Sequence, residues 1–358
     1  MLSKTPILAM LPIEISDKDN IFLLRKSLKA QLKINEVKHM LKGALINKDI
    51  FSFFYLQEAI KSTRIEGTQT TFTEVMESKI TGKISSETNE VQNYIKALEA
   101  GFNYISFNKK IDKELLLELQ RIILGKKEGK FRDVQNYIGT SSKNIIYTPP
   151  KSEDVMLYID NLIDFINNNE EFDTLVKVGI LHAQFESIHP FKDGNGRVGR
   201  ILISLYLYKE GLIDNPFFFI SEELEKNKNQ YYSLLTKVRE NEKNWVEWLS
   251  FFIDSSAKQA DKYLEKFNKI NNIHKKILEF SKKEKIESGY IMAVLLNPIF
   301  SIRDLQEKML KYNIKLSYNT IKMTINKLEE ANFISQIDKN KKRNKMYIFP
   351  ELVDVLSY

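Results

Sequence analysis

Apolar residues recur at spacings of three and four along most of the chain, which is the pattern of amphipathic or buried helices. Glycine and proline, which interrupt helices, are few, at 13 and 8 residues of 358. We therefore expect a mainly α protein. The pattern predicts helices over FLLRKSLKAQLKINEVKHML (22–41), FSFFYLQEAIKST (51–63), SEDVMLYIDNLIDFINNN (152–169), TLVKVGILHAQFESI (174–188), RVGRILISLYLYKEG (197–211) and KNWVEWLSFFIDSSAKQADKYLEKFNKI (243–270).

Two regions depart from this helical pattern. Residues 131–150 carry β-branched and aromatic residues on both sides of GTSSKN and end in two prolines, which predicts a small β-hairpin. After about residue 270, SIRDLQEKML and SYNTIKMTINKLEEANF predict two short helices, with Ser301 and Ser317 as N-caps and YNIKL as the turn. ISQIDKNKKRNKMYIF then predicts two strands joined by a basic loop. Helix, turn, helix, hairpin is the order of a winged helix-turn-helix.

Composition narrows the class of protein. Hydrophobic residues make up 43% and charged residues 28%, as in folded soluble proteins. Cysteine is absent, which excludes disulfides and thiolate metal sites. No apolar run approaches the roughly 20 residues that span a bilayer. Pro6 and Pro12 interrupt the apolar N-terminus, so we expect no signal peptide, a cytoplasmic location and no membrane contact.

The positive charge is concentrated in the last third of the chain. From Lys258 onward there are 20 Lys and Arg residues against 12 Asp and Glu, a net charge of +8, whereas the whole chain carries +7. This asymmetry predicts an acidic partner for the C-terminal region, such as nucleic acid, while a solvated lysine-rich surface is the alternative.

The segment HPFKDGNGRVGR, residues 189–200, concentrates candidate chemistry between two predicted helices. Gly194 and Gly196 allow backbone N–H groups to converge at the start of the second helix, where they form an anion site. Arg197 and Arg200 lie three residues apart, so both reach the same ligand. These features predict binding of an extended polyanion.

Two further side chains in the segment indicate which kind of reaction the bound polyanion would undergo. A carboxylate at Asp193 repels phosphate unless Mg²⁺ lies between them, and this ion typically binds one or two carboxylates together with phosphate oxygens. His189 has an ordinary pKa near 7 and is a candidate base for an incoming hydroxyl. The sequence therefore predicts a nucleotide–Mg²⁺ site with a base for a nucleophile.

The same segment matches in full the signature of the Fic family, His-Pro-Phe-x-(Asp/Glu)-Gly-Asn-Gly-Arg-x-x-Arg, and the chain resembles that family. The resemblance implies a Fic-fold helical domain that uses ATP and Mg²⁺ to transfer AMP to a protein hydroxyl, sometimes on the protein itself. It makes His189 the base, Phe191 an inward anchor of the loop and Asp193 the Mg²⁺ ligand. Asn195 and the glycine amides then hold the α-phosphate, and Arg197 and Arg200 hold the β- and γ-phosphates.

The resemblance extends beyond this loop. The hairpin at 138–150 is similar to the family's flap, on which a target segment aligns by β-augmentation. Residues 227–252 are similar to the segment that carries the base and ribose, with Tyr231 and Tyr232 as contacts, although ordinary helical core is the alternative for both tyrosines. Arg239 stands where some relatives have an amide, which leaves the contacts to adenine open.

An upstream helix ending in SxxxEG resembles the family's inhibitory motif. Ser62 and Glu66 lie four residues apart on one helix face, and Gly67 is a natural C-cap. In relatives with this motif the glutamate pairs with the second arginine, here Arg200. We expect two aligned charge-assisted hydrogen bonds between them. The predicted ligand contacts are then Glu66, Asp193, Gly194, Asn195, Gly196, Arg197, Val198, Gly199, Arg200, Tyr231 and Tyr232.

The sequence thus predicts three regions: N-terminal helices at 1–105 with the inhibitory helix at about 51–67, a Fic catalytic domain at 106–268 and a winged helix-turn-helix at 269–358. The predicted function is a self-inhibited adenylyltransferase acting on Tyr, Thr or Ser. The alternatives are removal of AMP by the same site, a different phosphate-containing donor, and a DNA-binding regulator whose Fic domain only senses nucleotide. Weak binding of DNA or protein by the C-terminal domain and a homodimer are further expectations.

Overall fold

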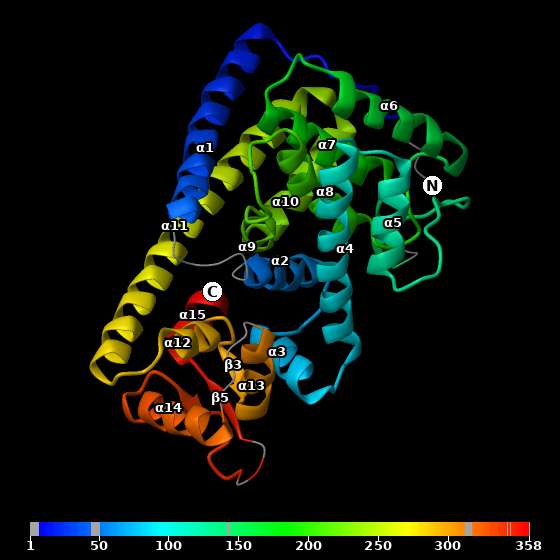
Figure 1. Cartoon of the computed structure of the whole chain (residues 1–358). Helices are drawn as coiled ribbons and strands as arrows, with labels where there is room; N and C mark the ends of the chain where they lie inside the picture. The colour runs from blue at the N-terminus through cyan, green and yellow to red at the C-terminus, as the bar shows by residue number, and fades with distance from the viewer. Residues whose placement is uncertain are drawn as a thin grey trace.

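The computed structural model describes residues 7–43, 51–141, 144–311, 317–341, 343 and 345–357. Helices form most of this structure and the strands are short, so the predicted mainly α fold is confirmed (Figure 1). The α-helices are α1 (Asp17–Gly43), α2 (Phe51–Ile65), α3 (Phe72–Thr81), α4 (Ser86–Asn108), α5 (Lys113–Ile123), α6 (Val155–Asn168), α7 (Thr174–Ile188), α8 (Asn195–Lys209), α9 (Ser221–Lys226), α10 (Lys228–Glu240), α11 (Trp245–Lys283), α12 (Ser288–Leu295), α13 (Ile302–Lys311), α14 (Tyr318–Glu330) and α15 (Pro350–Ser357). Two single 3-10 turns span Ser152–Asp154 and Glu242–Asn244.

Helix α7 lies at the centre of the molecule and begins and ends where the pattern predicted. Every residue from Leu175 to Ile188 is buried, as expected for a helix that is apolar on most sides. Helices α1, α6, α8, α10 and α11 all pack against it. Helices α4 and α5 contact α8, so the loop between α7 and α8 is supported from several directions.

Helix α11 is longer than the sequence pattern indicated. It runs for 39 residues beside α1 and continues past the predicted end at Ile270 into the C-terminal region (Figure 1). It therefore crosses the predicted domain boundary at 268/269 without a break, and α4 crosses the one at 105/106 in the same way. Neither predicted boundary coincides with the end of an element.

The predicted hairpin is present. Strands β1 (Ile138–Ser141) and β2 (Asn144–Tyr147) pair antiparallel, with irregular register at two points. Ile145 and Ile146 are exposed, whereas Tyr147 is buried and donates its hydroxyl hydrogen to Ser187 O at 2.9 Å. This bond ties the hairpin to the end of α7.

The C-terminal region has the predicted order of two helices and a hairpin, with elements that the pattern missed. Ser301 and Ser317 cap α13 and α14 as expected. Strands β4 (Ser335–Gln336) and β5 (Met346–Ile348) form the hairpin, and the unpredicted β3 (Ile299–Ser301) pairs with β5 to give the order β3-β5-β4. Helices α12 and α15 were also not predicted. The turn at 312–316 and Lys342 lie outside the described residues.

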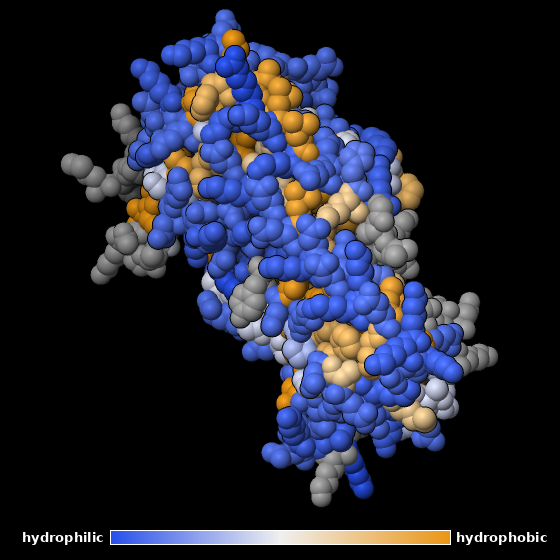
Figure 2. Space-filling model, turned by 90° about the vertical axis from the view of Figure 1, so that its left-hand side faces the viewer, coloured by the Kyte–Doolittle hydropathy of each residue, from blue (hydrophilic) through white to orange (hydrophobic). Residues whose placement is uncertain are grey.

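The face that carries α1 and α11 is mainly hydrophilic, with separate hydrophobic areas (Figure 2). On α1, Ile21, Leu24, Leu28 and Leu32 are 41% to 70% exposed. Within the described ranges no helix is long and apolar enough to span a bilayer.

Candidate functional site

A sharp loop connects α7 to α8 and brings the predicted residues together. His189 follows α7 in the left-handed region, with φ 49 and ψ 59, and its N–H donates to Phe185 O at 2.9 Å. Gly194, with φ 87, is the N-cap of α8. The first helical bond of α8 runs from Val198 N–H to Gly194 O. The N–H groups of residues 195–197 precede that bond and are therefore available to an anion.

Phe191 and Asn195 hold this loop in shape. Phe191 is fully buried and stacks on Phe131, with ring centroids 5.2 Å apart. The Asn195 side chain accepts from Phe191 N–H and donates to Phe191 O, both at 2.8 Å. The Asn195 side chain therefore braces the loop through the backbone of Phe191. The fully buried Val198 likewise faces the core.

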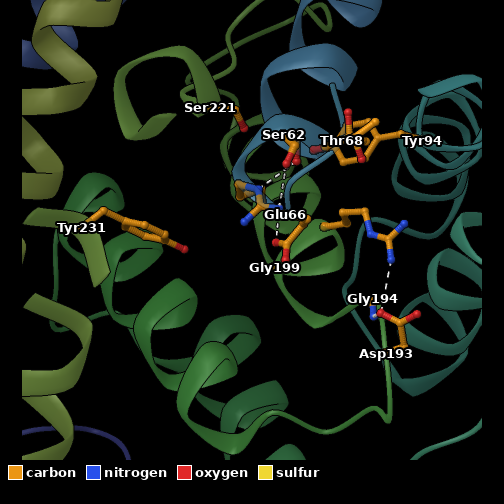
Figure 3. Close-up of polar contacts among 12 residues, drawn as sticks. Ser62, Glu66, Thr68, Tyr94, Asp193, Gly194, Gly199, Ser221 and Tyr231 are labelled. Carbon is orange, nitrogen blue, oxygen red and sulfur yellow. Dashed lines mark hydrogen bonds and ion pairs between the residues drawn. The ribbon is translucent and has the colours of Figure 1, made fainter. Parts of the chain in front are cut away.

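Arg200 is buried, and α2 binds its guanidinium (Figure 3). Nη2 donates to Glu66 Oε1 at 2.6 Å and to Ser62 O at 3.1 Å, and Nε donates to Ser62 Oγ at 2.8 Å. Burial alone would lower the pKa of Arg200, but the Glu66 carboxylate raises it well above its ordinary value. The predicted contact is present, but the expected pair of parallel bonds to Glu66 is not, because Ser62 takes the other donor.

Glu66 also lies against the start of α8. A Cβ atom built on Gly196 would fall 2.2 Å from Glu66 Oε1, so the carboxylate occupies the space that a side chain at this position would take. Glu66 itself follows α2 in a turn completed by Gly67 at φ 110. A negative charge from the protein thus lies at the helix N-terminus where an anionic ligand would bind.

A buried network that the sequence did not reveal holds α2 in place. Glu58 on α2 accepts hydrogen bonds from Tyr94 OH at 2.9 Å and from Ser221 Oγ at 2.5 Å. Burial raises the pKa of Glu58, while the bonds to Ser221 and Tyr94 act against that rise. The network links α2 to α4 and to the start of α9.

The pKa of His189 lies far below the value near 7 that the sequence predicted for this candidate base. Burial, followed by the charge of Arg239, lowers the pKa of His189 to about 3. Its Nδ1 atom has no hydrogen-bond partner within the described structure. Arg239 itself donates to Glu186 O at 3.0 Å and lies 4.1 Å from the ring centre of Tyr147 in the hairpin. The imidazole is therefore neutral, with one ring nitrogen unpaired among the described residues.

Asp193 is the exposed carboxylate of the loop. Its Oδ1 accepts from Gly194 N–H at 2.6 Å and from Arg197 Nη2 at 3.2 Å, and the side chain is 65% exposed. Among the described residues no group of three or more His, Asp or Glu side chains is arranged to hold a metal. A single exposed carboxylate beside an anion site fits Mg²⁺ that arrives with phosphates, because this ion keeps several waters and phosphate oxygens as ligands.

Arg197 and Arg200 are bound to different carboxylates in this structure. Arg197 is 10% exposed, with Asp193 at 3.2 Å and Glu90 at 4.0 Å. Its Nε atom is buried and unpartnered as far as the structure describes. Each arginine would exchange a carboxylate for a phosphate when a polyanion binds.

The tyrosine pair is split between the core and the surface. Tyr231 is 1% exposed, and its hydroxyl lies 2.9 Å from His182 Nε2. Gly199 O lies 3.1 Å from His182 Nδ1, and a carbonyl only accepts, so Nδ1 carries the proton and Tyr231 donates to Nε2. This placement favours the alternative of helical core for Tyr231. Tyr232 is 42% exposed and stays a candidate ligand contact.

Unsatisfied buried atoms gather around the loop. In the described part of the chain, Asn136 Oδ1, Glu186 Oε1, His189 Nδ1 and Arg197 Nε are buried without a partner. Glu186 fills the space beside Gly199, where a Cβ would meet Oε1 at 2.3 Å. Buried polar atoms without partners are rare in native structures, and their clustering here indicates a ligand site.

Fold and site together define a class: a helical protein in which a loop with a histidine leads into the N-terminus of a buried helix, and an internal carboxylate lies against that N-terminus. The chain belongs to the Fic/DOC family. The family model described as Fic/DOC family matches residues 110–207, and the one described as Fic/DOC family N-terminal matches residues 24–103.

Individual relatives agree with this assignment. A probable protein adenylyltransferase of Aquifex aeolicus is 36% identical over 104 residues, which are 29% of this chain and 30% of the relative. The protein adenylyltransferase Fic of Drosophila yakuba is 30% identical over 226 residues, 59% of this chain and 42% of the relative. The chain thus spans less than half of these relatives. A solved Fic family protein from Desulfovibrio desulfuricans G20 has the same fold, with TM-score 0.57, 19% identity and coverage of 94% and 97%.

Proposed function

We propose that this protein transfers AMP from ATP to a Tyr, Thr or Ser hydroxyl of a protein, and that Glu66 keeps the activity low. Family membership and the names of the adenylyltransferase relatives support the reaction class. The observation that carries the inhibition is the contact of Glu66 with both Arg200 and the Gly196 position.

The loop and two arginines account for ATP binding in this proposal. The amides that begin α8 would hold the phosphates nearest the transferred group, and Arg197 and Arg200 would hold the distal phosphates. Asp193 would hold Mg²⁺, which neutralises phosphate charge when bound. The exposed ring of Tyr232 would contact the nucleoside.

His189 supplies the base for the transfer. The target oxygen bonds to the α-phosphorus, the bond from that phosphorus to the bridging oxygen of pyrophosphate breaks, and the hydroxyl proton passes to the imidazole. Burial and Arg239 lower the pKa of His189 and keep the ring neutral before the transfer, so proton uptake requires a change in its surroundings. Negative charge from the nearby phosphates then favours the protonated ring. The remaining catalysis rests on positioning and charge neutralisation.

The direct test of the reaction uses ATP labelled at the α- or the γ-phosphate, with the Glu66→Gly protein. AMP transfer predicts that α-label accumulates on protein and that γ-label does not. Adding His189→Ala should lower the rate by roughly two to four orders of magnitude, because a general base contributes that much, with ATP affinity nearly unchanged. Incorporation of γ-label into protein, or a His189→Ala protein that transfers label at the full rate, would refute the assignment.

We further propose that the C-terminal region binds nucleic acid or protein weakly. Lys339, Lys341, Arg343 and Lys345 are exposed in the basic loop between β4 and β5, and Lys342 of the same loop lies outside the described residues. Tyr318, Asn319, Lys322 and Asn326 form an exposed face of α14. That face is not strongly basic, which supports non-specific contact with phosphates more than sequence recognition.

A further inference from the structure

Arg132 lies just before the hairpin and binds the backbone on both sides of His189. Its side chain is buried, and its Nε donates to His189 O at 3.0 Å and its Nη2 to Ile188 O at 3.4 Å. Its own N–H donates to Pro190 O at 2.9 Å. Arg132, although remote in sequence, thus donates hydrogen bonds to three consecutive carbonyl groups at the end of α7.

The backbone conformation of His189 requires such hydrogen bonds from a neighbouring residue. With φ 49 it occupies the left-handed region, which a side chain bearing a Cβ adopts at a cost and keeps only where neighbours hold it. The last carbonyls of α7 also have no partner within the helix. Arg132 meets both needs, because it satisfies the carbonyls of Ile188 and His189 while fixing the turn that aims the imidazole.

The same guanidinium reaches the two ends of the hairpin segment. Nη1 donates to Val134 O at 3.5 Å and Nη2 donates to Pro150 O. Arg132 therefore joins the base to the segment whose exposed residues, Ile145 and Ile146, would face a target. A planar fork with five donors can contact carbonyls from several segments at once, and a lysine ammonium cannot.

We propose that Arg132 is a positioning residue, which fixes His189 at the distance from the hairpin that transfer to a hairpin-bound hydroxyl requires. This inference rests on the proposed function. Arg132 acts through His189 and does not touch the nucleotide. Its loss should lower the rate of transfer and leave ATP binding in place.

The test compares Arg132→Lys with its parent in the Glu66→Gly background. Lysine keeps the positive charge and removes the fork, so a purely electrostatic role predicts the parental rate. A positioning role predicts a single-turnover rate at saturating ATP about a hundredfold lower, since a displacement of about 1 Å costs this much. The Kd for ATP, measured by calorimetry, should stay within about twofold of the parent. Gln184→Leu is the control, because Gln184 on α7 is equally buried and bonds Ala9 O at 2.8 Å, away from His189.

The outcomes separate this inference from the function on which it rests. A parental rate in Arg132→Lys overturns the inference, and so does a parallel loss of ATP binding and rate, which would mark a structural role. A Glu66→Gly parent that transfers nothing would refute the proposed function instead. In that case a crystal structure of Arg132→Lys tests the positioning role. A His189 that has left the left-handed region supports this role, and an unchanged φ at His189 contradicts it.

Discussion

Glu186 lies on α7, one turn before His189, with its carboxylate in the space that Gly199 leaves free. Burial raises the pKa of Glu186 to about 7; the charges of Arg200 and Arg239 act against the rise, and Glu66 adds to it. A folded-state pKa above the ordinary value of 4.5 means that the protonated form favours folding. This stabilisation is complete below pH 4.5 and is lost as the pH rises through 7.

We therefore predict a pH-dependent difference in stability between the wild type and Glu186→Gln. Relative to the variant, the wild type should lose about 2–3 kcal/mol of unfolding free energy between pH 5 and 8.5, because each pKa unit corresponds to about 1.4 kcal/mol. Urea unfolding at the two pH values measures this difference. His182 and His189 have lowered pKa values and lose stabilisation below pH 6.5, but they are present in both proteins and cancel. Parallel pH profiles for the two proteins would show that Glu186 is ionised throughout.

For single residues, the sequence predicted which side chains lie together but not which contacts each of them makes. His189, Asp193, Arg200 and Glu66 were found because their motifs are local and dense. The roles of Arg132, Glu58 and Ser221 were not predictable, since Arg132 binds His189 across 57 residues and Glu58 binds Ser221 across 163 residues of the chain. No spacing rule told whether the Asn195 amide faces the ligand or, as observed, the backbone of Phe191.

At the scale of elements, helix α2 is held from two sides. One face presents Ser62 and Glu66 to Arg200. Another meets the C-terminal helix α15, which lies next to α2 (Figure 1). Phe53 of α2 and Leu356 of α15 line the same small apolar cavity. The pattern predicted α2 and α7 well because both are apolar segments of 15 residues. It missed α15, which has eight residues, and β3, whose three residues are paired with β5 far along the chain.

Weakening the packing of α15 against α2 should therefore make α2 less firmly held. Removing a buried leucine side chain typically costs 2–5 kcal/mol of packing. We predict that Leu356→Ala raises self-labelling by α-labelled ATP at least about fivefold, the lower end of typical coupling between sites. Hydrogen exchange should rise at the amides of α2.

Val355→Ala provides the matched control for this prediction. Val355 is the neighbouring residue on α15 and lines a groove with Ile273 and Lys276 of α11, away from α2. It should label like the wild type. In a Glu66→Gly background Leu356→Ala should add nothing, and an additive gain there would mean that α15 acts by another route.

In the whole molecule, the excess positive charge and the proposed catalytic site lie in different parts of the chain. The excess positive charge belongs to the C-terminal third, whereas the catalytic loop lies between α7 and α8 in the helical core. We predict that the full chain binds duplex DNA only weakly and that log Kd changes linearly with log salt concentration, with a slope of about 3–4, as expected for four phosphate contacts. Fluorescence anisotropy with duplexes of unrelated sequence measures the slope. No binding at low salt would favour a protein partner.

In the proposed function, Glu66 restrains the enzyme by occupying Arg200 and the start of α8. The most direct measurement compares the rate of α-label incorporation by wild type, Glu66→Gly and Glu66→Gly/Arg200→Ala at equal protein and ATP concentrations. We predict a rise of about a hundredfold for Glu66→Gly, the cost of a misplaced α-phosphorus, and its loss in the double variant, with ATP bound by wild type and Glu66→Gly alike. A Glu66→Gly protein that labels no faster than the wild type while binding ATP would contradict the account.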